Sequence, residues 1–288
     1  MFAKRLISGI VLVILLVAIT IPGGYILWGA LLLLSLIAHR ELLRAVRLCG
    51  HLKSEETLTG NKNTIGCFSD LEIMGYLGII FYYLMMLLWP DTHVLLCCAP
   101  IILIAYSFLY VFSFPKYRAD QIMMSFFCVM YAPMMLSFIY LTRSLEYGQY
   151  LVWMIFVCSW ASDTCAYCVG MLFGKHRLAP VLSPKKSIEG AIGGIAGSAI
   201  VGFLISYFWY KNNMDVPGIT WMTVIIAALG SMLSQVGDLA ASAIKRNFEI
   251  KDYGRIIPGH GGIMDRFDSV IFTAPVIYFL TLIMIYGR

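Results

Sequence analysis

The chain has 288 residues, of which 60% are hydrophobic and 13% are charged, and its mean hydropathy is +0.82. A soluble protein of this length needs more charge to cover its surface, so the composition excludes an ordinary soluble globular domain. The formal net charge of +5 comes from lysines and arginines that are unevenly distributed along the chain.

Nine apolar segments predict an all-α fold, a polytopic membrane helix bundle with about nine transmembrane helices. About 20 apolar residues cross a hydrocarbon core of roughly 30 Å as a helix. The segments are residues 6–21, 24–38, 71–89, 93–113, 121–141, 150–171, 188–209, 219–243 and 269–286. Because Pro22, Gly23 and Gly24 separate the first two, we expect a tight helical hairpin there, although a re-entrant pair also fits.

The orientation of these spans follows from the distribution of positive charge. Nine spans with the N-terminus in the cytoplasm leave only Arg143, Lys211 and Arg288, of 21 lysines and arginines, on the outer side. Cytoplasmic loops of membrane proteins are enriched in lysine and arginine. The sequence therefore predicts a cytoplasmic N-terminus.

Two acidic residues lie inside predicted spans, Asp163 in the sixth and Asp238 in the eighth. An ionisable side chain within a span is costly and is a functional candidate by default. Asp238 belongs to a polar stripe on its helix, since Ser234, Ser242 and Lys245 lie four residues before it and four and seven residues after it. A stripe of this kind indicates that a polar partner packs opposite it.

The segment between the eighth and ninth spans is the expected partner. Gly261 and Gly262 permit close backbone approach and leave N–H groups free to bind phosphate oxygens. Asp265 and Asp268, three residues apart where the ninth helix should begin, can face one ligand, and His260 lies beside them. Acidic residues also occur as ordinary caps near helix starts. Carboxylate oxygens, however, are the ligands that Mg²⁺ prefers.

A third polar segment leads into the seventh span. Lys185 and Lys186 are flanked by Ser183 and Ser187 just before the helix start. Lysines and capping serines at a helix N-terminus form a site for anions. The alternative is that the lysines are only the positive flank of a span.

Acids for a divalent cation, lysines for phosphates and a membrane scaffold together indicate phosphoryl or nucleotidyl transfer on a lipid at the cytoplasmic surface. The chain contains no G-x-x-x-x-G-K-[ST], H-E-x-x-H or G-x-S-x-G pattern, which argues against a P-loop ATPase, a zinc protease and a serine esterase. A secondary transporter is a different class of function. Transporters usually carry repeats and acids near the bilayer centre, whereas the polar residues here gather at one face.

Residues 242–268 resemble the signature of phosphatidate cytidylyltransferases, also called CDP-diacylglycerol synthases. The match extends over 27 positions without a gap. Its residues are Ser242, Lys245, Arg246, Lys251, Asp252, Gly254, Pro258, Gly259, His260, Gly261, Gly262, Asp265, Arg266 and Asp268. Other blocks of the family resemble Asp163 to Tyr167, Gly174-Lys175, Ser183 to Lys186 and Glu189-Gly190, with Ser187 where the family usually has threonine. We therefore expect residues 1–149 to form an N-terminal region of about five spans, and 150–288 to form the catalytic region.

The resemblance implies transfer of the cytidylyl group of CTP to phosphatidate, with Mg²⁺ as cofactor. It implies that Asp238 and Asp265 are the metal ligands, with Asp268 as an additional candidate, and that Lys245 and His260 complete the catalytic set. Asp163 would orient a lysine or bind a second cation. The residues implied in substrate binding are Asp163, Ser183, Lys185, Lys186, Ser187, Ser242, Arg246, Lys251, Gly261, Gly262 and Arg266.

The closest alternative is a CTP-dependent polyprenol or phytol kinase, which has similar parts but transfers the γ-phosphoryl group. The expected partners are CTP, phosphatidate and the lipid bilayer, with a homodimer as a candidate assembly and no nucleic acid. The expected location is the bacterial plasma membrane, with the active site facing the cytoplasm.

Overall fold

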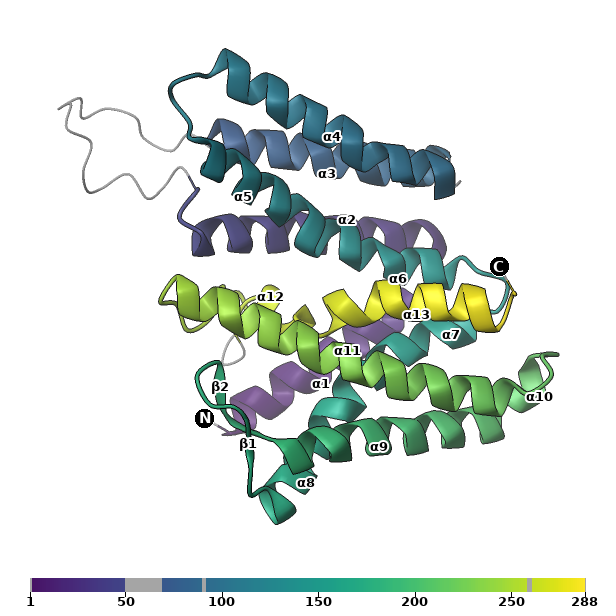
Figure 1. Ribbon diagram of the computed structural model, residues 1–288. Coiled ribbons are helices and arrows are strands. Elements are labelled where there is room, and N and C mark those ends of the chain that lie inside the picture. Colours follow the sequence, from purple (N-terminus) through teal and green to yellow (C-terminus); the bar gives the residue numbers. More distant parts are fainter. Residues whose placement is uncertain (1, 50–68, 90–91, 258–260, 288) are drawn as a thin grey trace.

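The computed structural model describes residues 2–49, 69–89, 92–257 and 261–287, which form a helical bundle with one small β-hairpin (Figure 1). The first helices are α1 (Phe2–Thr20), α2 (Gly24–Ala45), α3 (Asp70–Leu88), α4 (Thr92–Phe112), α5 (Ala119–Val129), α6 (Met135–Arg143) and α7 (Gly148–Phe156). They are followed by α8 (Ser162–Phe173), β1 (Arg177–Ala179), β2 (Ser183–Ser187), α9 (Ile188–Ile205), α10 (Lys211–Asn213), α11 (Ile219–Asn247), α12 (Met264–Phe267) and α13 (Val270–Met284). Three π-helical turns, Met130–Met134, Val157–Ala161 and Ser206–Tyr210, join α5 to α6, α7 to α8 and α9 to α10.

The predicted all-α membrane bundle is confirmed, since each of the nine apolar segments contains a helix. Seven helical stretches in the described residues are long and apolar enough to cross a membrane: Gly24–Ala45, Asp70–Leu88, Val94–Phe112, Ala119–Arg143, Gly148–Phe173, Ile188–Asn213 and Ile219–Asn247. Two more apolar helices are shorter, Gly9–Thr20 and Val270–Met284. The count of nine spans and the direction of the N-terminus therefore stay predictions.

The second helix is longer than the apolar segment that predicted it. Hydropathy ends the segment at residue 38, whereas α2 continues to Ala45. The added turns are polar in sequence but buried in the bundle, because His39 and Glu41 are 0% and 3% exposed. Polar side chains that face neighbouring helices allow a membrane helix to continue where its hydropathy falls.

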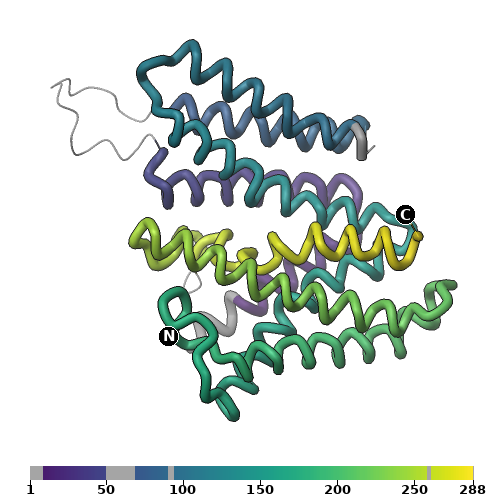
Figure 2. The backbone as a smooth tube through the Cα atoms, viewed as in Figure 1, coloured from purple at the N-terminus to yellow at the C-terminus, as the bar shows by residue number. Residues whose placement is uncertain are grey.

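The helices form two connected groups. In the first, α3 packs against α2, α4 and α5; in the second, α9 packs between α8 and α11. α13 joins the two groups, because it contacts both α6 and α11. Figure 2 shows the resulting order, with α3 and α4 at one side of the bundle, α8 and α9 at the other and α13 between them. The core of this arrangement is continuous.

Glycines on α9 permit very close packing against α8. A Cβ at Gly197 would lie 2.4 Å from Sγ of Cys165, and one at Gly193 would lie 2.5 Å from Cβ of Val169. Small residues let membrane helices approach until their backbones are nearly in contact. This packing fixes the end of α8 beside the start of α9, where the hairpin begins.

Positive charge gathers at one end of the bundle. The β-hairpin, α12 and the last turns of α2 and α11 lie at the left end in Figure 1, whereas α10 and the C-terminus lie at the right. Lysines and arginines on or beside these segments include Arg44, Arg47, Lys175, Arg177, Lys185, Lys186, Lys245, Arg246 and Arg266. Arg143 and Lys211, at the ends of α6 and α10, belong to the opposite end. The charge separation expected from the sequence is thus present in the fold.

Candidate active site

A cavity with charged and polar side chains in its wall opens at the positively charged end of the bundle. It has a volume of about 560 Å³ and lies between α8, the β-hairpin, α9 and α11. Its polar lining residues are Asp163, Tyr167, Arg177, Ser183, Lys185, Lys186, Ser187, Gln235 and Asp238. Six of them were candidates from the sequence, so the fold brings together residues that are as many as 75 positions apart.

An ion pair crosses this cavity. The Nζ of Lys186, on β2, donates to Oδ2 of Asp238 on α11. Both side chains are about one-quarter exposed, so the pair is accessible from the cavity. The polar stripe of α11 therefore has two partners, since Asp238 meets the hairpin while Lys245, two turns later, meets α12.

Local hydrogen bonds place the hairpin at the start of α9. Ser187 caps the helix, because its Oγ accepts a hydrogen bond from N–H of Gly190 at 3.1 Å. Glu189 accepts from the backbone N–H groups of Lys175 and His176, and its Oε1 lies 2.6 Å from Nδ1 of His176. These bonds hold the hairpin at the N-terminus of α9. The segment that the sequence treated as a loop is thus a short antiparallel hairpin.

Asp265 belongs to the residues we name the α12 turn, Gly261 to Asp268, and two backbone donors hold its carboxylate, one inside this turn and one before it. Its Oδ2 accepts from N–H of Tyr253 at 2.8 Å and from N–H of Gly262 at 3.0 Å, and its Oδ1 lies 3.2 Å from Nζ of Lys245. Gly261 adopts a positive φ of 90°, and a Cβ there would lie 2.7 Å from Oδ2 of Asp265. The signature residues thus hold the Asp265 carboxylate in a fixed position. Asp265 is only 8% exposed.

Asp268 lies at the end of the α12 turn and is the fourth acid of the site, after Asp163, Asp238 and Asp265. Its Oδ1 accepts from N–H of Ser269 at 2.9 Å. Burial, followed by the negative charge of Asp238, raises the pKa of the Asp268 carboxyl to about 7, and the charge of Asp163 acts in the same direction. Carboxylates from α8, α11 and the α12 turn therefore concentrate negative charge in one place.

The remaining candidates lie around this centre. Arg246 donates from Nε to the carbonyl of Leu182 at 3.5 Å, which connects α11 to the hairpin. Arg266 is half-buried, and its Nε has no hydrogen-bond partner among the residues that the structure describes. Ser242 is half-buried and Lys251 is exposed; neither makes a described contact with the site. His260 lies outside the described residues.

Sequence reasoning missed Gln235 and Arg177, which line the cavity. Gln235 donates from Nε2 to the carbonyl of Ala191 at 3.0 Å, so it joins α11 to α9. A signal was present in the sequence, since Gln235 is a polar residue inside a span and stands one turn before Asp238. Arg177 gave no such signal, because a basic residue in a cytoplasmic loop is expected on topological grounds.

The carboxylates of Asp238, Asp265 and Asp268 carry oxygen donors, the class of ligand that Mg²⁺ prefers. Within the described ranges, no group of three or more His, Cys, Asp or Glu side chains is arranged to hold an ion by itself. A bound Mg²⁺ would therefore take part of its shell from water and substrate phosphates, which is its usual behaviour.

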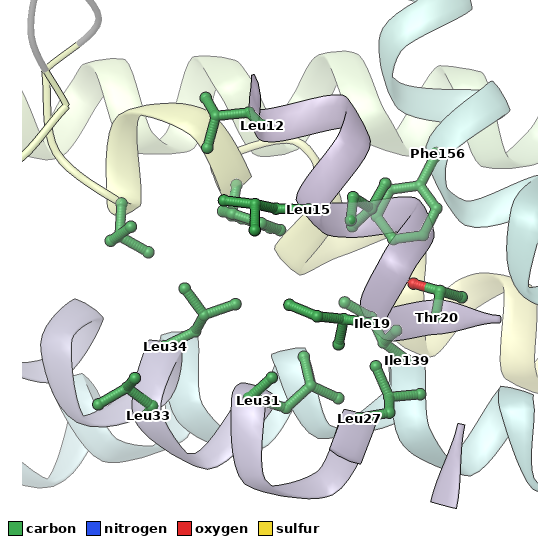
Figure 3. Close-up of a pocket in the computed structure, with 14 residues that line it drawn as sticks. Leu12, Leu15, Ile19, Thr20, Leu27, Leu31, Leu33, Leu34, Ile139 and Phe156 are labelled. Atoms are coloured by element: carbon green, nitrogen blue, oxygen red, sulfur yellow. The ribbon is translucent and has the colours of Figure 1, made fainter. Parts of the chain in front are cut away.

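A second cavity is apolar and adjoins the α12 turn. It has a volume of about 180 Å³ and lies between α1 and α2 (Figure 3). Leu12, Leu15 and Ile19 face it from α1, and Leu27, Leu31 and Leu34 face it from α2. Ile263 and Phe267, which lie two residues before and after Asp265, complete the lining.

Comparisons with known proteins agree with the signature. The chain matches the cytidylyltransferase family over residues 3–284. It is 35% identical over 281 residues to the phosphatidate cytidylyltransferase of Staphylococcus saprophyticus, covering 96% of this chain and 97% of the relative. The enzymes of the same name from Staphylococcus aureus strain COL and Staphylococcus haemolyticus are 36% and 34% identical, and each comparison covers at least 96% of both chains. None of these relatives supports a transporter or the alternative lipid kinase.

Proposed function

The chain belongs to the cytidylyltransferase family, and we propose that it transfers the cytidylyl group of CTP to phosphatidate, giving CDP-diacylglycerol and pyrophosphate for phospholipid synthesis. A phosphate oxygen of phosphatidate attacks the α-phosphorus of CTP, and the bond from that phosphorus to the bridging oxygen breaks. The pyrophosphate departs with the electron pair. Because a phosphate monoester has a second pKa of about 6, the nucleophile is largely deprotonated at neutral pH, and the reaction needs no general base.

The observation that carries the proposal is the Lys186–Asp238 pair in a cavity between membrane helices. A cavity of about 560 Å³ is within the range of small-molecule sites. Lys186, with Lys185 and Arg177 on the same hairpin, would hold the phosphates of CTP. Lys245, beside Asp265, would contact phosphate oxygens from the other side. Preorganised cations of this kind stabilise charge that develops on departing pyrophosphate.

The acids are the proposed ligands of Mg²⁺, with Asp238 and Asp265 as the primary pair and Asp268 as an additional ligand. When bound, the cation would neutralise the triphosphate and polarise the reacting phosphorus. The backbone bonds from Tyr253 and Gly262 keep Asp265 in a fixed direction before substrate arrives. Asp163 lines the same cavity and would orient Lys186 or bind a second cation.

The lipid half of the reaction is supported by the apolar cavity in Figure 3. Its lining includes Ile263 and Phe267, which flank Asp265 in the chain. An acyl chain between α1 and α2 would thus lie beside the α12 turn, while the phosphate of the same lipid faces the acids. Apolar surface is the expected lining for such a chain.

We further propose that the site faces the cytoplasm of a bacterial cell, from the plasma membrane. The lysines and arginines gather at the end of the bundle that carries the site, which agrees with the positive-inside rule. The Staphylococcus relatives are bacterial. A homodimer stays a prediction.

The product of the reaction tests the proposal directly. Purified protein in detergent is incubated with phosphatidate, Mg²⁺ and CTP labelled at either the α- or the γ-phosphate. We expect label from the α-phosphate in a cytidine-bearing lipid, together with stoichiometric pyrophosphate. Label from the γ-phosphate in the lipid, with release of CDP, would instead identify a kinase.

A further inference from the structure

Glu41 is a buried carboxylate that the proposed reaction does not use. It lies on α2, in the part of the chain that the sequence treated as scaffold, and it is 3% exposed. Its Oε1 accepts from N–H of Ile263 at 3.1 Å, and its Oε2 accepts from N–H of Met264 at 2.9 Å. Backbone N–H groups at the start of a helix have no partner within the helix. Glu41 supplies that partner for α12, although it lies 222 residues earlier in the chain than Ile263.

Two glycines of the signature make room for this carboxylate. A Cβ at Gly262 would lie 2.3 Å from Oε1 of Glu41 and 2.4 Å from Oε2. A Cβ at Gly254 would lie 2.1 Å from Oε1. Both distances are far below van der Waals contact, so any side chain at either position would displace Glu41. The glycines therefore fit the close approach of an acid from α2.

The same backbone holds Glu41 on one side and Asp265 on the other. The Cβ position of Gly262 faces the Glu41 carboxylate, while its N–H donates to Oδ2 of Asp265. Ile263 and Met264, which donate to Glu41, are the two residues immediately before Asp265. The contact with α2 thus bears on the position of the α12 turn, and hence on the direction of the Asp265 oxygen that faces Lys245.

We propose that Glu41 is a positioning residue of the transferase: it holds the α12 turn so that Asp265 faces the cation and the phosphates. This inference rests on the function proposed above. It assigns a role in the reaction to the N-terminal half of the chain, through an acid that touches neither substrate.

The first test is the substitution Glu41→Gln. Glutamine has nearly the same shape, but it has one acceptor oxygen, and its NH₂ group would face a backbone N–H. Misplacement of a reacting group by about 1 Å costs on the order of 100-fold in rate, so we expect kcat to fall by about that factor. The Mg²⁺ concentration for half-maximal rate should rise, whereas KM for CTP changes little. The matched control is Glu72→Gln, which alters another fully buried acid without contact to the α12 turn.

Hydrogen–deuterium exchange gives a readout that does not depend on activity. Peptides that cover the α12 turn should exchange faster in Glu41→Gln than in the wild type, and should not change in Glu72→Gln. If the wild type makes no CDP-diacylglycerol, the proposed function fails while exchange still tests the contact. If Glu41→Gln keeps the kcat, the Mg²⁺ requirement and the exchange rate of the wild type, the positioning role of Glu41 is overturned. The proposed transferase function would then still stand.

A double-mutant cycle with Gly262→Ala tests the contact from the other side. In the wild type, the added methyl group should displace Glu41, lower kcat and speed exchange of the α12 turn. In a Glu41→Ala background the methyl group has room and should add little further loss, so the two effects are coupled. Gly29→Ala is the control, because a Cβ there meets nothing within 4 Å. Additive losses of kcat in the two variants would overturn the proposal that Gly262 and Glu41 act through their contact. Where Glu41 variants do not fold, the exchange rate of the α12 turn in Gly262→Ala tests the contact, and unchanged exchange would overturn it.

Discussion

Both halves of the bundle have carboxylates in membrane helices, but these carboxylates differ in their exposure and in their partners. Glu72 on α3 is 0% exposed and has a complete set of partners, since it accepts from Tyr76 at 3.0 Å and from Cys49 at 3.3 Å, with Arg40 at 3.6 Å. Asp238 on α11 is one-quarter exposed and faces a cavity, with Lys186 as its ion-pair partner. An acid that is satisfied by its own helices is structural, whereas one that shares a cavity with a lysine remains accessible to ligands.

Hydroxyl pairs between helices occur in both halves. In the first half, Tyr83 bonds Ser35 at 2.7 Å and Tyr106 bonds Ser125 at 3.0 Å. In the second half, the pairs of serines 159 and 269 and of serines 162 and 231 lie at 2.5 Å and 2.7 Å. Such pairs satisfy polar groups that lipid cannot satisfy, and they join helices into a scaffold. The halves therefore differ in the charge that they present to a cavity, and Glu41 connects them.

The largest effect on activity is expected for Asp265→Asn, which changes an acid of the second half. Loss of a metal ligand removes several kcal/mol of transition-state stabilisation, so we expect activity to fall by about 1000-fold or more. The variant should remain folded, because asparagine can still accept the hydrogen bond from Tyr253. Product formation at saturating Mg²⁺ is the measurement, and thermal unfolding in detergent is the control for folding. Wild-type turnover would remove Asp265 from the metal site, while Glu72→Gln should retain activity.

A smaller effect is expected for Lys186→Ala. A hydrogen bond to a charged group contributes about 2 kcal/mol, which corresponds to roughly a 30-fold rise in KM for CTP or phosphatidate. Lys211→Ala serves as the matched variant, since Lys211 is an exposed lysine at the other end of the bundle. Steady-state kinetics with each substrate varied in turn separates the two requirements. Unchanged KM values for both substrates would mean that Lys186 does not bind substrate and is only part of the positive flank of the span.

Ser187→Ala should act on stability. Loss of the serine cap of α9 costs about 1 kcal/mol of unfolding free energy. The comparison residue is Ser107 on α4, an exposed serine that bonds only the carbonyl of Leu103 on its own helix; its replacement by alanine should cost less than about 0.5 kcal/mol. Thermal unfolding of both variants measures the difference. Equal losses of unfolding free energy in the two variants would mean that the Ser187 cap does not stabilise the start of α9.

The smallest effect is expected at the Lys116–Asp70 ion pair, which joins the α4–α5 connection to α3. Both side chains are about half exposed, and exposed ion pairs contribute less than about 1 kcal/mol. Lys116→Ala should therefore leave the unfolding transition nearly unchanged and the kinetics unaltered. A loss of transferase activity would contradict a purely structural role for this ion pair.

Much of the site was predictable because the signature is contiguous. Asp265, Asp268 and the glycines lie within eight residues, and the stripe of α11 follows from helical spacing. Glu41 was not predictable, because it stands beyond the end of an apolar segment and resembles a polar flank. The β-hairpin was missed for a similar reason: a segment of lysines and serines beside a span reads as a loop.

The sequence by itself determined the membrane class, the helices, the separation of positive charge and the family, because each depends on local composition or on a short continuous motif. Only the tertiary structure decided which acids are accessible and which are satisfied. It also decided that Asp163 and Asp238 line one cavity with Lys186, and that an acid of α2 holds the α12 turn. These outcomes depend on helix packing, which brings together side chains that no spacing in the sequence relates.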